Sequence, residues 1–228
     1  NIKFRAYDIY IFSVSVLLRR LPGGIWHWAG RSTLYNKFNN VSFKNTTISN
    51  FIEWISLLMV GFGTYFLLKR SYVSIGFFII VYYICKKWFD KNNPTKKINY
   101  FLPLILLILY FGSWMIGGLI LSINGNVLMN GSEISTMRYL QSWFLSGSIS
   151  MIIFFLPAGF GIREISLSVL LKPYLGLSFS VLLAVIIRII FILSELIWGF
   201  LGYIFFRKSK NNDKLSFQDD TKDDFKAN

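Results

Sequence analysis

Two adjacent residues of opposite charge, Arg163 and Glu164, stand in an otherwise apolar segment, 160–174. On a helix, neighbouring side chains diverge by about 100 degrees, so these two cannot form one simple pair. Arg163 instead shares a side with Ser166, and Glu164 shares a side with Ser168. A guanidinium, hydroxyls and the N–H groups of a helix start are groups that bind phosphate. We therefore expect a binding site for a lipid head group here, the alternative being an interfacial helix whose arginine reaches ordinary head groups.

Three further ionisable residues, Glu53, Arg188 and Glu195, lie inside long apolar runs. Glu195 follows Arg188 by two helical turns and shares its face, but a rise of about 10 Å prevents direct contact. An unpaired charge inside a membrane costs several kcal/mol or more, so such residues face a partner or a polar path. We expect a polar seam formed by these three residues, the alternative being an ion pair that only fixes helix register.

A proline–glycine break occurs twice, as Leu21-Pro22-Gly23-Gly24 and as Leu156-Pro157-Ala158-Gly159. Within a bilayer, protein or a water-filled cavity must satisfy the backbone groups that such a break releases. Paired breaks of this kind indicate a binding site inside the membrane. We therefore assign substrate binding to Arg163 and Glu164 together with the break residues, which are Pro22, Gly23, Gly24, Pro157, Gly159 and Gly161.

The two breaks belong to a longer internal repeat with an offset of 135 residues. The offset places Lys37 on Lys172 and Glu53 on Arg188. Two equivalent helices thus carry opposite charges at one level, and we expect Glu53 and Arg188 to form a pair. Arg31 plays the part of Arg163 in the first copy, although the two align only with a gap of three residues.

The composition indicates an integral membrane protein. Hydrophobic residues make up 54% of the 228 residues and charged residues only 15%, well below the share in soluble domains. The net charge of +13 comes mainly from cations in short loops and in the tail, which favours membrane orientation and lipid contact over nucleic acid. With one cysteine, Cys85, and one histidine, His27, the chain offers neither an internal disulfide nor a zinc site, and no cofactor is expected.

Apolar runs predict an all-α, polytopic membrane helix bundle. A crossing needs about 20 mainly apolar residues. The expected spans are about 6–20, 50–68, 71–89, 99–123, 136–156 and 178–206. Two short segments, 25–40 and 160–174, are expected to be broken or re-entrant helices, and the polar tail 207–228 is expected to be disordered. The distribution of lysines does not determine on which side of the membrane the tail lies.

Six glycines on the apolar runs are expected to permit close helix packing; they are Gly61, Gly63, Gly117, Gly118, Gly199 and Gly202. The first apolar run is short and contains Asp8, which does not fit a cleaved signal peptide. We expect the chain to be a fragment that lacks upstream helices.

The stretch Leu156-Pro157-Ala158-Gly159-Phe160-Gly161-Ile162-Arg163-Glu164, followed by Leu175-Gly176-Leu177-Ser178, resembles the second signature of the lysylphosphatidylglycerol synthase transmembrane-region family. Leu21-Pro22-Gly23-Gly24 with Arg31 and Glu53 resembles the first signature more loosely. The resemblance implies a flippase-like integral membrane protein of the stand-alone kind. The family's fused members carry a soluble aminoacyl-transferase domain, which this chain lacks, so lysyl transfer does not carry over.

Together these features favour a lipid carrier that is not an enzyme. It would translocate or bind a phospholipid or lipid-linked glycan with an anionic or zwitterionic head group, as a multi-pass protein of the plasma membrane. The alternative is a non-catalytic subunit or scaffold of a lipid-modifying system, with a glycosyltransferase or an aminoacyl-lipid synthase as partner. Neither a nucleophile and base set nor a phosphate-binding loop is recognisable in the sequence.

Overall fold

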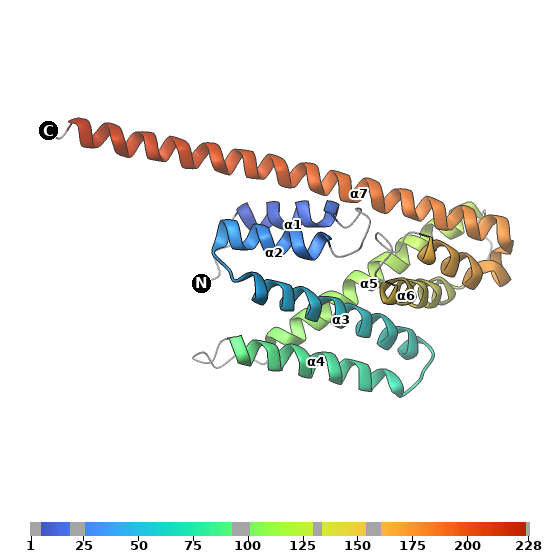
Figure 1. Cartoon of the computed structure of the whole chain (residues 1–228). Helices are drawn as coiled ribbons and strands as arrows, with labels where there is room; N and C mark the ends of the chain where they lie inside the picture. The colour runs from blue at the N-terminus through green and yellow to red at the C-terminus, as the bar shows by residue number, and fades with distance from the viewer. Residues whose placement is uncertain (1–5, 19–25, 93–100, 130–133, 154–160, 227–228) are drawn as a thin grey trace. The chain divides into compact units, whose positions relative to one another are not determined.

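The protein is all-α. The computed structural model describes residues 6–18, 26–92, 101–129, 134–153 and 161–226, and in this part of the chain every regular element is a helix (Figure 1). The helices are α1 (Ala6–Leu18), α2 (Trp26–Asn39), α3 (Phe43–Leu68), α4 (Val73–Asn92), α5 (Phe101–Leu128), α6 (Thr136–Ile152) and α7 (Ile162–Lys226). The helix-bundle class predicted from the apolar runs is confirmed.

Three of the described helices are long and apolar enough to cross a membrane, which identifies the chain as a membrane protein. They are Phe43–Leu68, Pro103–Leu128 and Ile162–Arg207. The crossings predicted over 6–20, 71–89 and 136–156 fall on α1, α4 and α6. Of these helices α1 and α6 are short, with 13 and 17 residues, and α4 ends in a charged turn. These three crossings stay predictions.

A kink at Gly176 divides α7 into a short first part and a long second part. Gly176 has φ 74° and ψ 165°, a backbone conformation that is essentially restricted to glycine, and Pro173 lies just before it. The two parts fold back on each other, as is shown by Ser168 Oγ, which lies 3.4 Å from the carbonyl oxygen of Ser180 across the kink. The short segment predicted over 160–174 is therefore a separate helical arm of a hairpin.

The helix bounds repeat with the offset seen in the sequence. Shifted by 135 residues, the first residue of α2 falls on Gly161, just before α7 begins, and the first residue of α3 falls on Ser178, just after the kink. Asn40, with φ 52°, ends the short helix of the first copy as Gly176 ends that of the second. The starts of α2 and α3 are therefore compatible with the repeat, which stays a prediction.

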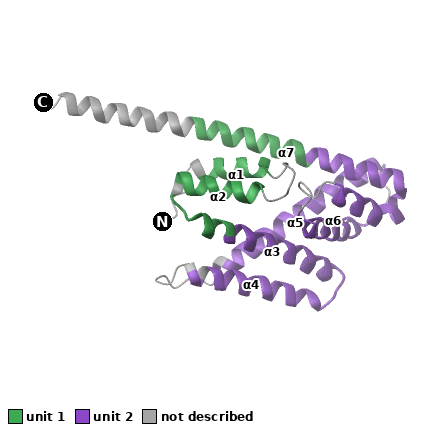
Figure 2. Cartoon of the chain, in the orientation of Figure 1, with its two compact units in different colours: residues 1–47, 191–228 green, residues 48–190 purple. Residues whose placement is uncertain are grey.

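The chain forms two compact units, residues 1–47 with 191–228 and residues 48–190 (Figure 2). In the first unit, α1 packs on the last part of α7. A Cβ atom at Gly199 would lie 2.6 Å from Leu17, and one at Gly202 would meet Ser13. Tyr10 and Phe206 stack with ring centroids 4.0 Å apart. Helix α7 continues to Lys226, and its side chains are described as far as Arg207. The predicted disorder of residues 207–228 stays a prediction.

In the second unit, two buried tryptophans fit against glycines of neighbouring helices. The Trp143 ring of α6 lies against Gly117 and Gly118 of α5. Trp114 of α5 lies against Gly61 of α3 and Gly147 of α6. The indole N–H of Trp114 also donates to the carbonyl oxygen of Leu57, 3.1 Å away. The predicted packing role of Gly61, Gly63, Gly117, Gly118, Gly199 and Gly202 is confirmed, since a Cβ atom at each would press on a side chain.

Two glycines of α5 allow a matched test of this packing. A Cβ atom at Gly117 would lie 2.5 Å from Trp143 Cζ2, whereas one at Gly112 would have no neighbour within 4 Å. Gly117→Ala should lower the free energy of unfolding by about 1–3 kcal/mol, because the buried indole has to move. Gly112→Ala should leave it unchanged or raise it by up to about 1 kcal/mol. Thermal unfolding in detergent checks both, and equal effects would contradict the packing.

Candidate functional site

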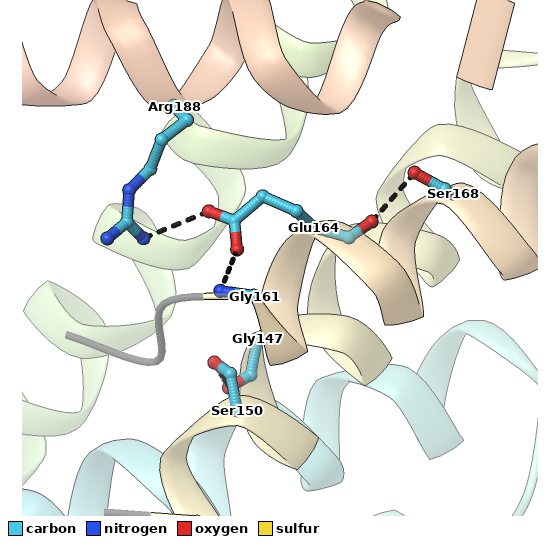
Figure 3. A network of polar contacts seen from close by, with 6 residues as sticks. All are labelled: Gly147, Ser150, Gly161, Glu164, Ser168 and Arg188. Atoms are coloured by element: carbon cyan, nitrogen blue, oxygen red, sulfur yellow. Dashed lines mark hydrogen bonds and ion pairs between the residues drawn. The ribbon is translucent and has the colours of Figure 1, made fainter. Parts of the chain in front are cut away.

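The Glu164 carboxylate of α7 lies at the centre of a polar cluster in the second unit (Figure 3). Its Oε1 atom is 3.0 Å from Nη1 of Arg188, and its Oε2 atom accepts the Gly161 N–H at 2.8 Å. The Arg188 and Glu164 side chains keep 14% and 20% of their surface exposed. The pair is therefore largely buried, but part of each side chain stays accessible.

Local sequence explains why Glu164 turns back toward Gly161. The Gly161 carbonyl oxygen accepts the Ile165 N–H at 2.8 Å, so Gly161 is the N-cap of α7. Glu164 then stands at the third helical position, from which a glutamate can accept the N–H of the cap residue, as in a capping box. Its negative charge also suits the positive end of the helix dipole. Gly161 has φ 85°, a conformation that glycine adopts without strain.

Serine hydroxyls bind backbone oxygens on both arms of the α7 hairpin. Ser168 Oγ donates to the Glu164 carbonyl oxygen at 2.7 Å and also approaches the Ser180 carbonyl oxygen. Ser180 Oγ donates to the Gly176 carbonyl oxygen at 2.6 Å. The carbonyl of the kink residue is thus satisfied by protein, as a break in an apolar helix requires.

Two arginine side chains of this unit lie over aromatic rings. The guanidinium carbon of Arg163 lies 4.0 Å from the Trp143 ring centroid, and that of Arg138 lies 4.3 Å from the Tyr174 ring centroid. Such cation–π contacts attract a guanidinium to the face of the aromatic ring. Arg163 and Glu164 therefore have different partners, Trp143 and Arg188, which confirms that these neighbours diverge around the helix.

Arg31, the predicted counterpart of Arg163, lies on α2 in the first unit. Its Nε atom is 3.4 Å from Ser15 Oγ, and its guanidinium carbon lies 5.0 Å from the Phe12 ring centroid. Arg31 therefore also combines an aromatic face with a hydroxyl. These partners are on α1, one helix earlier in the chain.

The structure describes only part of the predicted site. The break residues Pro22, Gly23, Gly24, Pro157 and Gly159 lie outside the described residues. The described ion pair of Arg188 is with Glu164, a partner that the sequence comparison did not suggest. A pair between Glu53 and Arg188 is not among the described contacts and stays a prediction. Glu195 belongs to the other unit, so the seam of three charges is likewise a prediction.

Sequence reasoning missed two features of the site. Trp143, whose ring contacts Arg163, was not predicted to belong to the site, and no spacing in the sequence indicates this contact. The partnership of Glu164 and Arg188 did have a signal, since each residue lies twelve positions from Gly176. A chain that folds back at Gly176 brings two such residues to the same level.

The cluster offers the Arg188 guanidinium as a binding group for an anion, and the Glu164 carboxylate already occupies it. The Arg163 guanidinium, which lies over Trp143, is a second cationic group on the same turn of α7. Among the described residues, no group of three His, Cys, Asp or Glu side chains is placed to hold a metal ion. Comparison of the chain with family models, with curated proteins and with solved structures finds no match.

A double-mutant cycle tests the pair of Glu164 and Arg188. Glu164→Ala removes the carboxylate from Arg188 and the acceptor from the Gly161 N–H, and should lower the free energy of unfolding by about 1–3 kcal/mol. The coupling energy with Arg188→Ala should be about 1–3 kcal/mol. A parallel cycle that combines Asp90→Ala with Arg188→Ala is the control, because Asp90 is an exposed acid near the end of α4. The effects of these two substitutions on the free energy of unfolding should be additive. Additivity in both cycles would contradict the pair.

Proposed function

We propose that this membrane protein is a flippase-like carrier that translocates a phospholipid or a lipid-linked glycan between leaflets. It would work in the plasma membrane without covalent chemistry, as a stand-alone relative of the lysylphosphatidylglycerol synthase transmembrane region. The observation that carries the proposal is the charged first turn of α7. Arg163 and Glu164 there face separate partners on α6 and on the far arm of the hairpin.

The chemistry of Arg163 favours a phosphate-bearing head group. The guanidinium of Arg163 lies over the Trp143 ring, and its N–H donors all lie in one plane. A planar set of donors suits the oxygens of phosphate, and a stacked arginine is more restricted than a flexible lysine. The aromatic contact thus supports a role for Arg163 in orienting a head group.

The position of the cluster also supports movement through the membrane. Arg188 and Glu164 both belong to the apolar range Ile162–Arg207, which is long enough to cross a membrane. Ionisable residues within such a range are expensive and are typical of substrate pathways. The turn at Gly176 supplies irregular backbone within the same range, as is found at the binding sites of carriers.

A second candidate is a non-catalytic subunit or scaffold of a lipid-modifying system. Under that reading Arg163 contributes to folding or lipid contact but not to lipid movement. A glycosyltransferase or an aminoacyl-lipid synthase would then be the partner that performs the chemistry. The two readings differ in what the purified chain does alone.

Reconstitution in liposomes with a fluorescent phosphatidylglycerol tests the carrier. The wild-type chain should equilibrate the labelled lipid between leaflets faster than protein-free liposomes. Arg163→Ala should slow this by about 10- to 100-fold, the equivalent of a lost charge-assisted hydrogen bond of about 1.5–3 kcal/mol. Arg163→Lys should fall between the two, and Glu53→Ala should also slow the exchange if the predicted seam lines the path.

Lys172→Ala is the matched control, since Lys172 is an exposed cation on the same arm of α7. It should exchange lipid at the wild-type rate. If folded wild-type protein exchanges lipid no faster than protein-free liposomes, the carrier reading is wrong and the scaffold reading stands. If Arg163→Ala and Lys172→Ala behave alike, Arg163 has no special role.

A further inference from the structure

The ion pair of Arg188 and Glu164 has a setting unlike that of a surface pair. Arg188 stands between isoleucines on both sides, in the sequence Ile186-Ile187-Arg188-Ile189-Ile190. Its guanidinium meets the Glu164 carboxylate at 3.0 Å, and both side chains are only slightly exposed. An arginine in such surroundings is tolerated because an anion lies beside it.

The Glu164 carboxylate also has the bonding pattern of a bound ligand. One oxygen faces a guanidinium N–H and the other accepts a backbone N–H, from Gly161 (Figure 3). Phosphate oxygens accept the same two kinds of donor. The remaining exposure of both side chains leaves the pair open to an incoming group.

We propose that the phosphate of a bound lipid and the Glu164 carboxylate exchange on Arg188. This inference rests on the proposed carrier function and names the residue that receives the head group. Glu164 holds Arg188 when no lipid is bound, and it gives way when a lipid phosphate arrives. Arg188 is then a head-group ligand, and Glu164 is the residue that competes with the lipid.

Electrostatics makes the exchange selective. Removing one partner leaves the other charge uncompensated in a largely buried position, so Glu164 leaves readily only when another anion replaces it. A phosphate supplies that anion, whereas a neutral sugar head group does not. A lipid-linked glycan therefore qualifies through its phosphate and not through its sugars.

The exchange also affects the start of α7. When the carboxylate leaves, the Gly161 N–H loses its acceptor at 2.8 Å, directly after the proline–glycine break. The hydrogen bonds of Ser168 to backbone oxygens of both arms do not involve this carboxylate. Lipid binding would thus release the first turn of α7 while the hairpin stays closed.

Binding of phosphatidylglycerol to the full chain in mixed micelles tests the exchange. Glu164→Gln keeps an oxygen for the Gly161 N–H but removes the competing charge. It should lower the apparent Kd about tenfold, if the carboxylate occupies Arg188 about 90% of the time in the wild type. Arg188→Gln should raise the apparent Kd, and the double variant should behave like Arg188→Gln.

Asp90→Asn is the control, because Asp90 is an exposed acid and its replacement changes the net charge as much as Glu164→Gln does. This variant should leave the apparent Kd unchanged. A diglucosyl diacylglycerol, which has no phosphate, should bind wild type and Glu164→Gln alike. A folded Glu164→Gln variant with an unchanged or higher Kd for phosphatidylglycerol would overturn the exchange. Equal tightening toward the glucolipid would overturn the role of phosphate, and the same response to inorganic phosphate at similar concentration would overturn the lipid assignment.

The same two assays separate failure of the exchange from failure of the carrier. Wild-type protein that moves lipid, together with a Glu164→Gln variant that does not bind more tightly, rules out the exchange alone. Wild-type protein that moves no lipid but shows the predicted Kd changes rules out the carrier and supports the binding site.

Discussion

The contact between Glu164 and Arg188 is the interaction on which the arrangement of the second unit depends. It joins the two arms of the α7 hairpin, and through the Gly161 N–H it also fixes the first turn after the break. Both ends of the contact are charged in a helix range apolar enough to span a membrane. A charge without a partner is costly in such a range, so the pair stabilises the contact between the two arms. A carboxylate at the third helical position after a glycine cap is the local feature that makes this geometry available.

Close packing around two tryptophans determines where the rest of the site lies. Gly117 and Gly118 leave room for the Trp143 ring on α5, and that ring in turn carries Arg163. Trp114 occupies the space beside Gly61 and Gly147, and its indole N–H is bonded to a backbone oxygen of α3. Since lipid surrounds the helices without a hydrophobic force between them, small residues and hydrogen bonds of this kind provide the association. The position of Arg163 therefore follows from glycines two helices away in the sequence.

Much of the helix layout could be predicted from the sequence, because apolar run length and proline–glycine breaks are local signals. The segments 25–40 and 160–174 appear as α2 and the first arm of α7, close to their predicted bounds. The contact of Arg188 with Glu164 was not predicted, because the repeat suggests only a pair between equivalent helices of different copies. The described contact instead forms within one copy, where the chain folds back at Gly176. A contact between side chains of different helices, such as that of Arg163 with Trp143, produces no periodic pattern in the sequence, so it could not be predicted.

The repeat that unites the two copies also shows why their roles differ. With the offset of 135 residues, Ala29 stands where the second copy has Glu164, and Glu53 stands where it has Arg188. The first copy therefore has a carboxylate at the position where the second has a guanidinium, and an alanine at the position where the second has Glu164. An anionic head group would be attracted to the second copy and repelled at the equivalent position of the first. Among the described residues, a carboxylate and a guanidinium at positions 164 and 188 form a pair in the second copy, and the equivalent positions 29 and 53 of the first copy hold an alanine and a glutamate, which cannot form such a pair.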